Sequence, residues 1–242
     1  MNNKEKQDFI EGLSFDIDKT AEIKIRRNVY IYISFPSKQI DNIEKYIADG
    51  WEIDKEFKTK IKLRKKKESK HLLVDKMWAL FASLGFDLLN RNQAIDIPYD
   101  KKDNSLFETF DILAKDQESI VLVRCESAVK NAKSNFKDKL ELLKDHIGEI
   151  RKTLNYIFDG AKLKFKFILA TENYALMEQD QLALEKIGGV HFDEDIIDYY
   201  IKMHNQIGIA ARYQLLGSLF FDQEIPEMDN KIPAIRGKMG GH

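Results

Sequence analysis

The sequence predicts an α/β protein in which a mixed central sheet is flanked by helices and preceded by a small α+β unit. Two apolar segments, Phe107 to Ala114 and Ser119 to Ser127, are joined by the polar residues 115–118, which is typical of a β-hairpin. A long amphipathic segment and another β-type segment follow, and a strand–helix–strand crossover implies parallel pairing. An antiparallel hairpin that continues into a parallel crossover predicts a mixed sheet.

Residues 1–66 are expected to form the small α+β unit. The β-type segment Asn28 to Phe35 precedes a helical pattern over Lys38 to Ala48, and a second strand is predicted over Phe57 to Arg64. Apolar and basic side chains alternate along this second strand, so its basic residues share one face: Lys58, Lys60, Lys62 and Arg64. Cations about 6.6 Å apart suit nucleic-acid phosphates, but the solvated face of a half-covered sheet gives the same pattern.

Residues 70–222 are expected to form the larger domain, after a linker at Lys65 to Ser69. Residues 223–242, rich in glycine and proline, are expected to be a flexible connector. Helical periodicity and β-branched runs predict the elements of the larger domain. Besides the hairpin, these are helices over His71 to Leu84, Val129 to Phe158, Gln179 to Lys186 and Ile196 to Phe220, the last interrupted at Gly208, and strands at Ile95 to Pro98, Leu163 to Thr171 and Val190 to Phe192.

Charged residues lie within both strands of the predicted hairpin, at Asp111 on the first and at Arg124 and Glu126 on the second. Side chains alternate along a strand, so Arg124 and Glu126 share one face and Cys125 lies on the other. Burying an unpaired charge costs several kcal/mol as an order of magnitude. The charges therefore indicate a site, whereas Cys125 is interpreted as a buried small residue.

The hairpin resembles the core of the PD-(D/E)XK nucleases, which has Asp on its first strand and Glu-x-Lys on its second. Asp111 matches the Asp, and the segment VLVRCESA is similar to the apolar-ECKSA strand of that family. Arg124 stands where the family has Glu, and Glu126 stands where it has Lys. The resemblance implies a restriction-endonuclease-like α-β-β-β-α-β core, in which Asp and Glu hold a divalent metal and Lys orients or activates water.

The altered motif leaves two classes of function open. In the first, the chain is a catalytically impaired module that binds DNA or a protein partner, and Arg124 forms an ion pair with Asp111 that Glu126 extends. Repulsion between Arg124 and a cation about 4 Å away is worth roughly 4 kcal/mol per unit charge at an effective dielectric constant of about 20. In the second, the chain is an active Mg²⁺-dependent endonuclease. Its metal ligands are Asp111 and Glu126, and Lys130 or Lys133 on the following helix replaces the missing lysine.

Two further residues have a functional and a structural interpretation. Asp75 is the nearest match to the acidic residue that opening helices of the nuclease family often carry, and it is also explained as a first-turn acid favoured by the helix dipole. The five histidines lack metal-ligand spacing, and His191, on the last short strand, is the one expected nearest a site.

The C-terminal stretch resembles a segment of bacterial DGQHR-domain proteins, which are similar to DndB and are associated with DNA phosphorothioation and other defence systems. The resemblance rests on residues 210–217 (AARYQLLG) and 233–241 (PAIRGKMGG). It implies a role in DNA modification or phage defence, with DNA as a partner and with a protein partner or a missing C-terminal domain. Assembly into oligomers is compatible with this expectation.

The composition indicates where the protein is expected to be located, but it does not indicate what the protein binds. The 39 basic and 40 acidic residues balance, so no global charge indicates nucleic-acid binding. A single cysteine excludes an internal disulfide and suits a reducing cytoplasm. No segment approaches the run of about 18 apolar residues that a membrane span needs. A cytoplasmic protein is therefore expected, and the resemblance to DGQHR-domain proteins implies a bacterial one.

Overall fold

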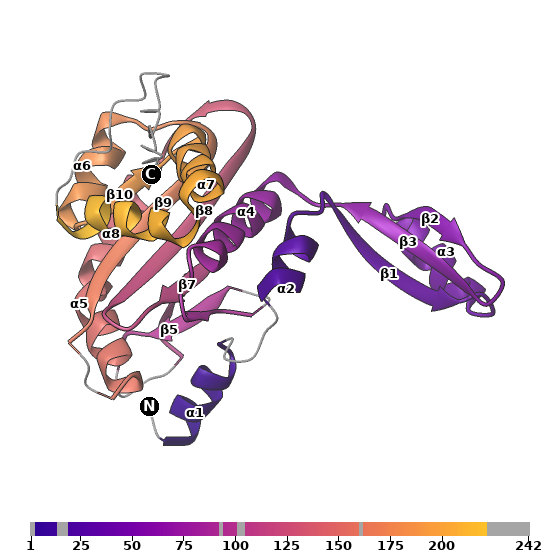
Figure 1. The fold of residues 1–242 in the computed structure, drawn as a ribbon, viewed down its shortest axis with the longest axis horizontal. Helices are drawn as coiled ribbons and strands as arrows, with labels where there is room; N and C mark the ends of the chain where they lie inside the picture. Colours follow the sequence, from indigo (N-terminus) through magenta and orange to yellow (C-terminus); the bar gives the residue numbers. More distant parts are fainter. Residues whose placement is uncertain (1–2, 14–18, 92–93, 101–104, 160–161, 222–242) are drawn as a thin grey trace, which may run out of the picture.

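The computed structural model describes residues 3–13, 19–91, 94–100, 105–159 and 162–221 (Figure 1). A mixed five-stranded sheet forms the centre of the larger body, in the spatial order β10-β9-β8-β7-β4. Its strands are β4 (Leu88–Leu89), β7 (Ile112–Lys115), β8 (Ser119–Lys133), β9 (Lys164–Ala175) and β10 (Val190–Phe192). β7 pairs antiparallel with β4 and β8, whereas β9 is parallel to β8 and β10. The predicted mixed sheet is confirmed.

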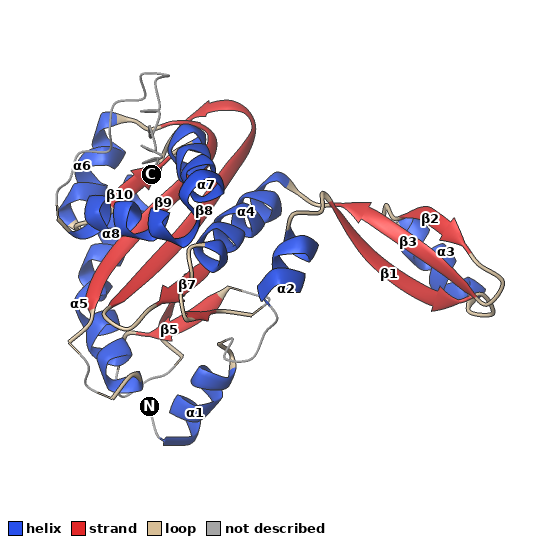
Figure 2. Ribbon diagram, viewed as in Figure 1, coloured by secondary structure: helices blue, strands red, loops and turns tan. Residues whose placement is uncertain are grey.

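Helices cover both faces of this sheet (Figure 2). One face carries α4 (Ser69–Ser83), α7 (Glu194–Ile207), a short 3₁₀ turn η1 (Gly208–Ala210) and α8 (Ala211–Phe220). The other carries α5 (Lys137–Ile157) and α6 (Glu178–Lys186). Val121 and Val123 of β8 pack in the first core, and Ile120 and Leu122 pack in the second, as the alternation along a strand requires.

The five-stranded sheet and its helices follow the predicted α-β-β-β-α-β order as α4, β4, β7, β8, α5 and β9. The first of these strands is β4, which the sequence patterns do not indicate, and the strand predicted at Ile95 to Pro98 is β5 of a separate two-stranded sheet. The interruption predicted at Gly208 is also confirmed, because η1 separates α7 from α8 there. None of the described helices combines the length and apolarity that a membrane crossing needs.

Two details of the central segment differ from the predictions. The first hairpin strand is broken at Asp111 into β6 (Phe107–Phe110), which pairs with β5 (Ile95–Pro98), and β7. The helix predicted from Val129 begins at Lys137, because β8 continues to Lys133 and pairs with β9 there. Pairing with a neighbouring strand outweighs the helical preference of this short segment.

A second, antiparallel sheet of three strands extends away from the larger body (Figure 1). Its order is β1-β3-β2, with β1 (Tyr30–Pro36), β2 (Glu52–Glu56) and β3 (Lys60–Lys66). One face packs on α3 (Ile40–Ala48) through aromatic contacts of Tyr46, whose ring centroid lies 4.9 Å from that of Phe35 and 5.5 Å from that of Trp51. The strand predicted from Phe57 begins at Lys60, and the sequence patterns do not indicate β2.

Two short helices precede the small sheet and contact the larger body. They are α1 (Asn3–Glu11) and α2 (Lys19–Arg26), which sequence patterns did not identify. Phe9 and Ile10 of α1 pack against the core beneath α5, and Ile23 of α2 packs against the core beneath α4. Helices α1 and α2 therefore lie on the larger body, and strands β1 to β3 lie outside it. The division of the chain into domains after residue 66 stays a prediction.

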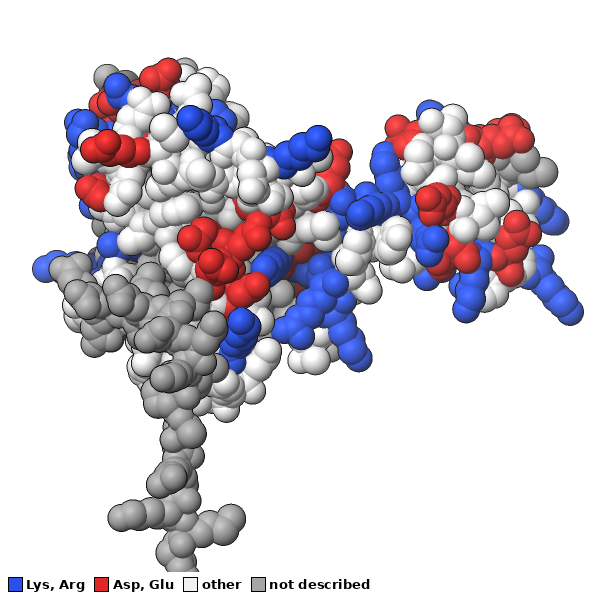
Figure 3. Space-filling model, turned by 90° about the horizontal axis from the view of Figure 1, so that it is seen from above, with Lys and Arg blue, Asp and Glu red and all other residues white. Residues whose placement is uncertain are grey.

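A buried carboxylate joins the two chain segments that connect the small sheet to the larger body. Asp75 of α4 is 3% exposed, and its two oxygens lie 2.8 Å from Arg26 Nη1 and 2.7 Å from Lys67 Nζ. Arg26 precedes β1 and Lys67 follows β3, so one side chain holds both ends of the connection. Figure 3 shows Lys and Arg side chains on the surface where the small sheet joins the larger body. Asp75 lies beyond the first turn of α4, so these cations, and not the helix dipole, account for its position.

We predict that Asp75→Asn lowers the free energy of unfolding by about 3–5 kcal/mol, because it removes a buried charge that two cations share. Arg26 keeps Glu22, 2.9 Å from its Nε, so most of the loss comes from Lys67. The matched control is Asp49→Asn, which removes a carboxylate 3.1 Å from Lys65 in an exposed pair and should cost about 1 kcal/mol or less. Urea unfolding of both variants measures the difference. Equal losses would contradict the role given to Asp75.

Candidate functional site

Asp111 lies at the break between β6 and β7, where its backbone and side chain both bond to β8. Its N–H donates to the Val123 carbonyl over 2.9 Å, and its Oδ2 accepts the Cys125 N–H over 2.7 Å. Nζ of Lys70, in the first turn of α4, lies 3.4 Å from Oδ1. One carboxylate oxygen is therefore bonded to the sheet and the other is paired with a cation.

Arg124 pairs with Glu108 of β6. Its Nε also donates to the Thr109 carbonyl over 3.0 Å. The second carboxylate oxygen of Glu108 lies 2.7 Å from Nδ1 of His146 on α5. The predicted Asp111–Arg124 ion pair is wrong, because Arg124 has its partners on the α5 side of the sheet and Asp111 has its cation on the α4 side.

The alternation along β8 explains this separation. Cys125 lies in the core that α4 covers, so its two neighbours along the strand face the α5 side. Glu126 lies 3.3 Å from Nζ of Lys139 on α5, which matches the orientation of Arg124. The structure therefore brings Arg124 and Glu126 to one face, as predicted, but it gives Asp111 a different set of partners.

These residues do not fit a divalent cation. Mg²⁺ prefers octahedral coordination by oxygens and usually takes one or two carboxylates. Asp111 has both oxygens engaged, and Glu126 is paired with a different helix. Within the described ranges, no group of three or more His, Cys, Asp or Glu side chains is arranged to hold a metal. We therefore derive no metal-dependent step from this geometry.

Lys130 and Lys133 lie on β8 and not on a helix, so their predicted placement is wrong. Ser127 pairs with Glu172 of β9, and pairing resumes at Ala132, which leaves residues 128–131 as a bulge. Lys130 in this bulge is exposed. Asp111 and Glu126 have other lysines as their cations, Lys70 and Lys139.

A cavity of about 300 Å³ adjoins Asp111, and sequence reasoning missed most of its polar residues. Lys70, His71 and Asp75 line it from α4. Nε2 of His71 lies 3.4 Å from Asp75, and the i,i+4 spacing of these two residues was a usable signal. No local sequence pattern indicates that Lys70 pairs with Asp111, because the two residues are far apart in the chain.

Two other candidate residues have structural surroundings. Cys125 is fully buried, as predicted, and burial, together with the Asp111 carboxylate, raises the pKa of its thiol well above the usual value. His191 on β10 lies 2.8 Å from the Thr171 hydroxyl, and burial lowers its pKa although Asp193 opposes the shift. β9 and β8 lie between β10 and β7, so His191 is remote from the Asp111 cavity.

The predicted basic face lies on the side of the small sheet that α3 does not cover, which we call the outer face. It presents Lys60, Lys62 and Arg64 from β3 and Tyr30 and Tyr32 from β1. Lys58 lies in the exposed turn before β3.

Carboxylates of β2 accompany two of these cations. Lys62 Nζ lies 3.0 Å from Asp54, and Arg64 Nε lies 3.2 Å from Glu52. The alternation along the predicted strand does not reveal these carboxylates, because it does not show that β2 pairs with β3.

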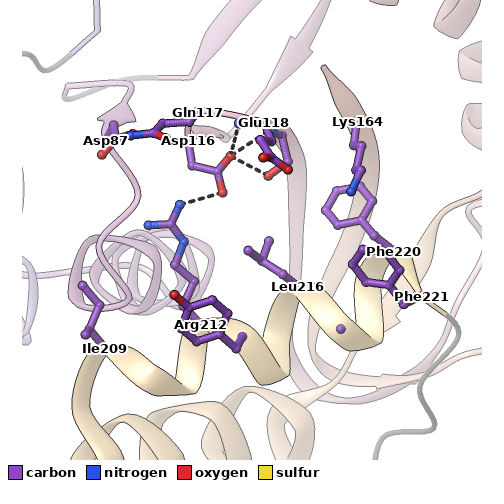
Figure 4. A pocket seen from close by; sticks show the side chains of 13 residues that line it. Asp87, Asp116, Gln117, Glu118, Lys164, Ile209, Arg212, Leu216, Phe220 and Phe221 are labelled. Carbon is purple, nitrogen blue, oxygen red and sulfur yellow. Dashed lines mark hydrogen bonds and ion pairs between the residues drawn. The ribbon is translucent and has the colours of Figure 1, made fainter. Parts of the chain in front are cut away.

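A larger cavity, of about 660 Å³, lies between α8 and the turn that joins β7 to β8 (Figure 4). Asp116 in that turn accepts the N–H groups of Glu118 and Ser119, and Arg212 of α8 lies 2.7 Å from its Oδ2. Burial would raise the pKa of Asp116, but Arg212 and these donors bring it below its ordinary value. The charged groups joined across this cavity attach α8 to the hairpin.

Comparisons with known proteins give no family. No family model matches the chain, and no curated protein matches it. Among solved structures, it is similar to protein VC1899 from Vibrio cholerae, with 10% sequence identity and a TM-score of 0.37. The match covers 84% of this chain and 60% of that one. At this level the likeness carries no functional argument.

We predict that substitutions at Arg124 and Glu126 reduce stability by different amounts. Arg124→Glu places a second carboxylate beside Glu108, whose side chain is 11% exposed, and should cost about 3 kcal/mol or more. Glu126→Lys places an ammonium beside Lys139, which is 66% exposed, and should cost about 1 kcal/mol or less. Urea unfolding of the single variants measures both. A more harmful Glu126→Lys would show that Arg124 is not the better-packed charge.

Proposed function

We propose that this chain is a nuclease-like DNA-binding module of a bacterial DNA-modification or anti-phage defence system, and that it does not cleave DNA. The observation that carries the proposal is the arrangement around Asp111. The element order and the position of Asp111 agree with a PD-(D/E)XK hairpin, but its carboxylate is held by Lys70 and by the Cys125 N–H.

The charges near the hairpin support a non-catalytic role. Arg124 stands where the nuclease family has a metal-binding Glu, and its charge is balanced by Glu108. Paired charges need no metal to offset their burial. The alternative, a Mg²⁺-dependent endonuclease that uses Asp111, Glu126 and Lys130, requires three side chains to converge that have different neighbours here.

DNA binding is proposed for the outer face of the small sheet. Lys60, Lys62 and Arg64 share this face, and the sheet stands away from the larger body (Figure 1). Cations that follow a strand can neutralise successive phosphates and release the counterions that DNA holds.

The defence context rests on the C-terminal resemblance to DGQHR-domain proteins. Residues 210–217 of that resemblance span the end of η1 and most of α8. Residues 233–241 lie outside the described part of the chain, as does the connector predicted for 223–242. A cytoplasmic location and a protein partner belong to this same proposal.

We predict that replacing Lys58, Lys60 and Lys62 with Ala weakens DNA binding at low salt. The log–log salt slope should become shallower by roughly 0.9 for each duplex phosphate that the variant no longer neutralises, and by roughly 0.7 for each single-strand phosphate. Fluorescence anisotropy across a salt series measures both quantities. The control replaces Lys137, Lys144 and Lys152 of α5, which are exposed and change the net charge equally. An unchanged slope in the β3 variant, or an equal fall in the control, would contradict the proposed surface.

We predict that the unmodified chain does not cut duplex or single-stranded DNA with Mg²⁺ or Mn²⁺, and that calorimetry detects only weak Mn²⁺ binding. Asp111→Ala is the informative variant, because the alternative makes the Asp111 carboxylate a metal ligand. Metal-dependent cleavage that disappears in Asp111→Ala would overturn the non-catalytic proposal.

A further inference from the structure

We infer that the outer face of the small sheet binds single-stranded nucleic acid by stacking bases on Tyr30 and Tyr32. This inference rests on the proposed function and names its substrate class. The evidence for it is the position of two tyrosines of β1 beside the basic residues of β3.

On the outer face, the tyrosines of β1 lie beside the cations of β3. Tyr32 pairs with Arg64 in the register of β1 and β3, and Ser34 pairs with Lys62. Nζ of Lys62 lies 3.7 Å from the centroid of the Tyr32 ring, and the Arg64 guanidinium lies 4.7 Å from that of Tyr30. Tyr32 is 39% exposed although it lies on a paired strand. Proteins bind single strands with aromatic rings that stack on bases and with cations that contact phosphates. Here the flexible Lys62 and Arg64 side chains lie over the ring faces, so they move from the rings to the phosphates when a base stacks.

The spacing of the rings favours a single strand over a duplex. The ring centroids of Tyr30 and Tyr32 are 6.5 Å apart. Successive bases in one strand of B-DNA rise by about 3.4 Å, so two neighbouring bases reach both rings only when the strand is extended and unstacked. A duplex keeps its bases paired and presents their edges in the grooves, which leaves no base face for either ring.

The ion pairs on the outer face also favour binding by base stacking over binding by phosphate contacts alone. Asp54 and Glu52 are ion-paired with Lys62 and Arg64, so two of the cations are partly neutralised before any phosphate arrives. A binding mode that relied on phosphates alone would be weakened by these carboxylates. Stacking does not depend on net charge, and it can supply the affinity that the paired cations do not.

The test compares Tyr32→Ala, Tyr30→Ala and the conservative variants Tyr32→Phe and Tyr30→Phe. The probes are a short fluorescein-labelled oligothymidylate, the equivalent oligouridylate and a duplex of the same length. Each Tyr→Ala change should weaken single-strand binding by about tenfold or more, each Tyr→Phe change should preserve it, and neither should change duplex binding. Circular dichroism and urea unfolding exclude the loss of the sheet as the cause.

A Tyr32→Trp variant reports base stacking directly through its fluorescence, which a purely structural role of Tyr32 would not affect. A base stacked on the new indole should quench its fluorescence when oligothymidylate is added, and the quench should be absent with the duplex. Equal affinity of the Ala and Phe variants, or preferential duplex binding that depends on Lys60 and Lys62, would overturn the inference and leave the proposed function standing. Failure to bind any of the three probes would overturn both.

Discussion

The two-residue alternation of side chains along β8 determines which residues face each core of the larger body. This strand pairs with β7 on one side and with β9 on the other, so its register fixes the faces of the whole sheet. Val121, Val123 and Cys125 are committed to the core beneath α4. Arg124 and Glu126 therefore face α5, where Arg124 pairs with Glu108 and Glu126 pairs with Lys139.

Charge pairing inside the chain accounts for most of the features that resemble a site. Asp75 is held by Arg26 and Lys67, Asp111 by Lys70, and Asp116 by Arg212. Each of these carboxylates fixes the position of a helix or a chain connection, which is a structural role. The outer face of the small sheet differs, because its cations lie over Tyr32, which is 39% exposed, and over the half-buried Tyr30, on the side of the sheet away from α3.

Sequence patterns predicted the central architecture because its signals are local. The β-type run at 190–192 and the break at Gly208 are reproduced by the structure, and so is the order of elements from α4 to β9. The start of α5 was missed because pairing with β9 holds residues 132–133 in a strand, an effect that no local pattern reveals. The partners of Asp111 and Arg124 were missed for the same reason, since Lys70 and Glu108 come from other elements. The shared face of Lys60, Lys62 and Arg64 was predicted from alternation alone, whereas Glu52 and Asp54 required knowledge of the strand order.

We propose that the small sheet holds nucleic acid and that Asp111 does not hold a metal. Diffraction from crystals grown with Mn²⁺ and a single-stranded oligonucleotide tests both halves in one experiment, because Mn²⁺ is located by its anomalous signal. We expect nucleotide density against Tyr30 and Tyr32 and no anomalous peak beside Asp111. A Mn²⁺ peak bound by Asp111 and Glu126, with the oligonucleotide running past it, would show that both parts of this proposal are wrong.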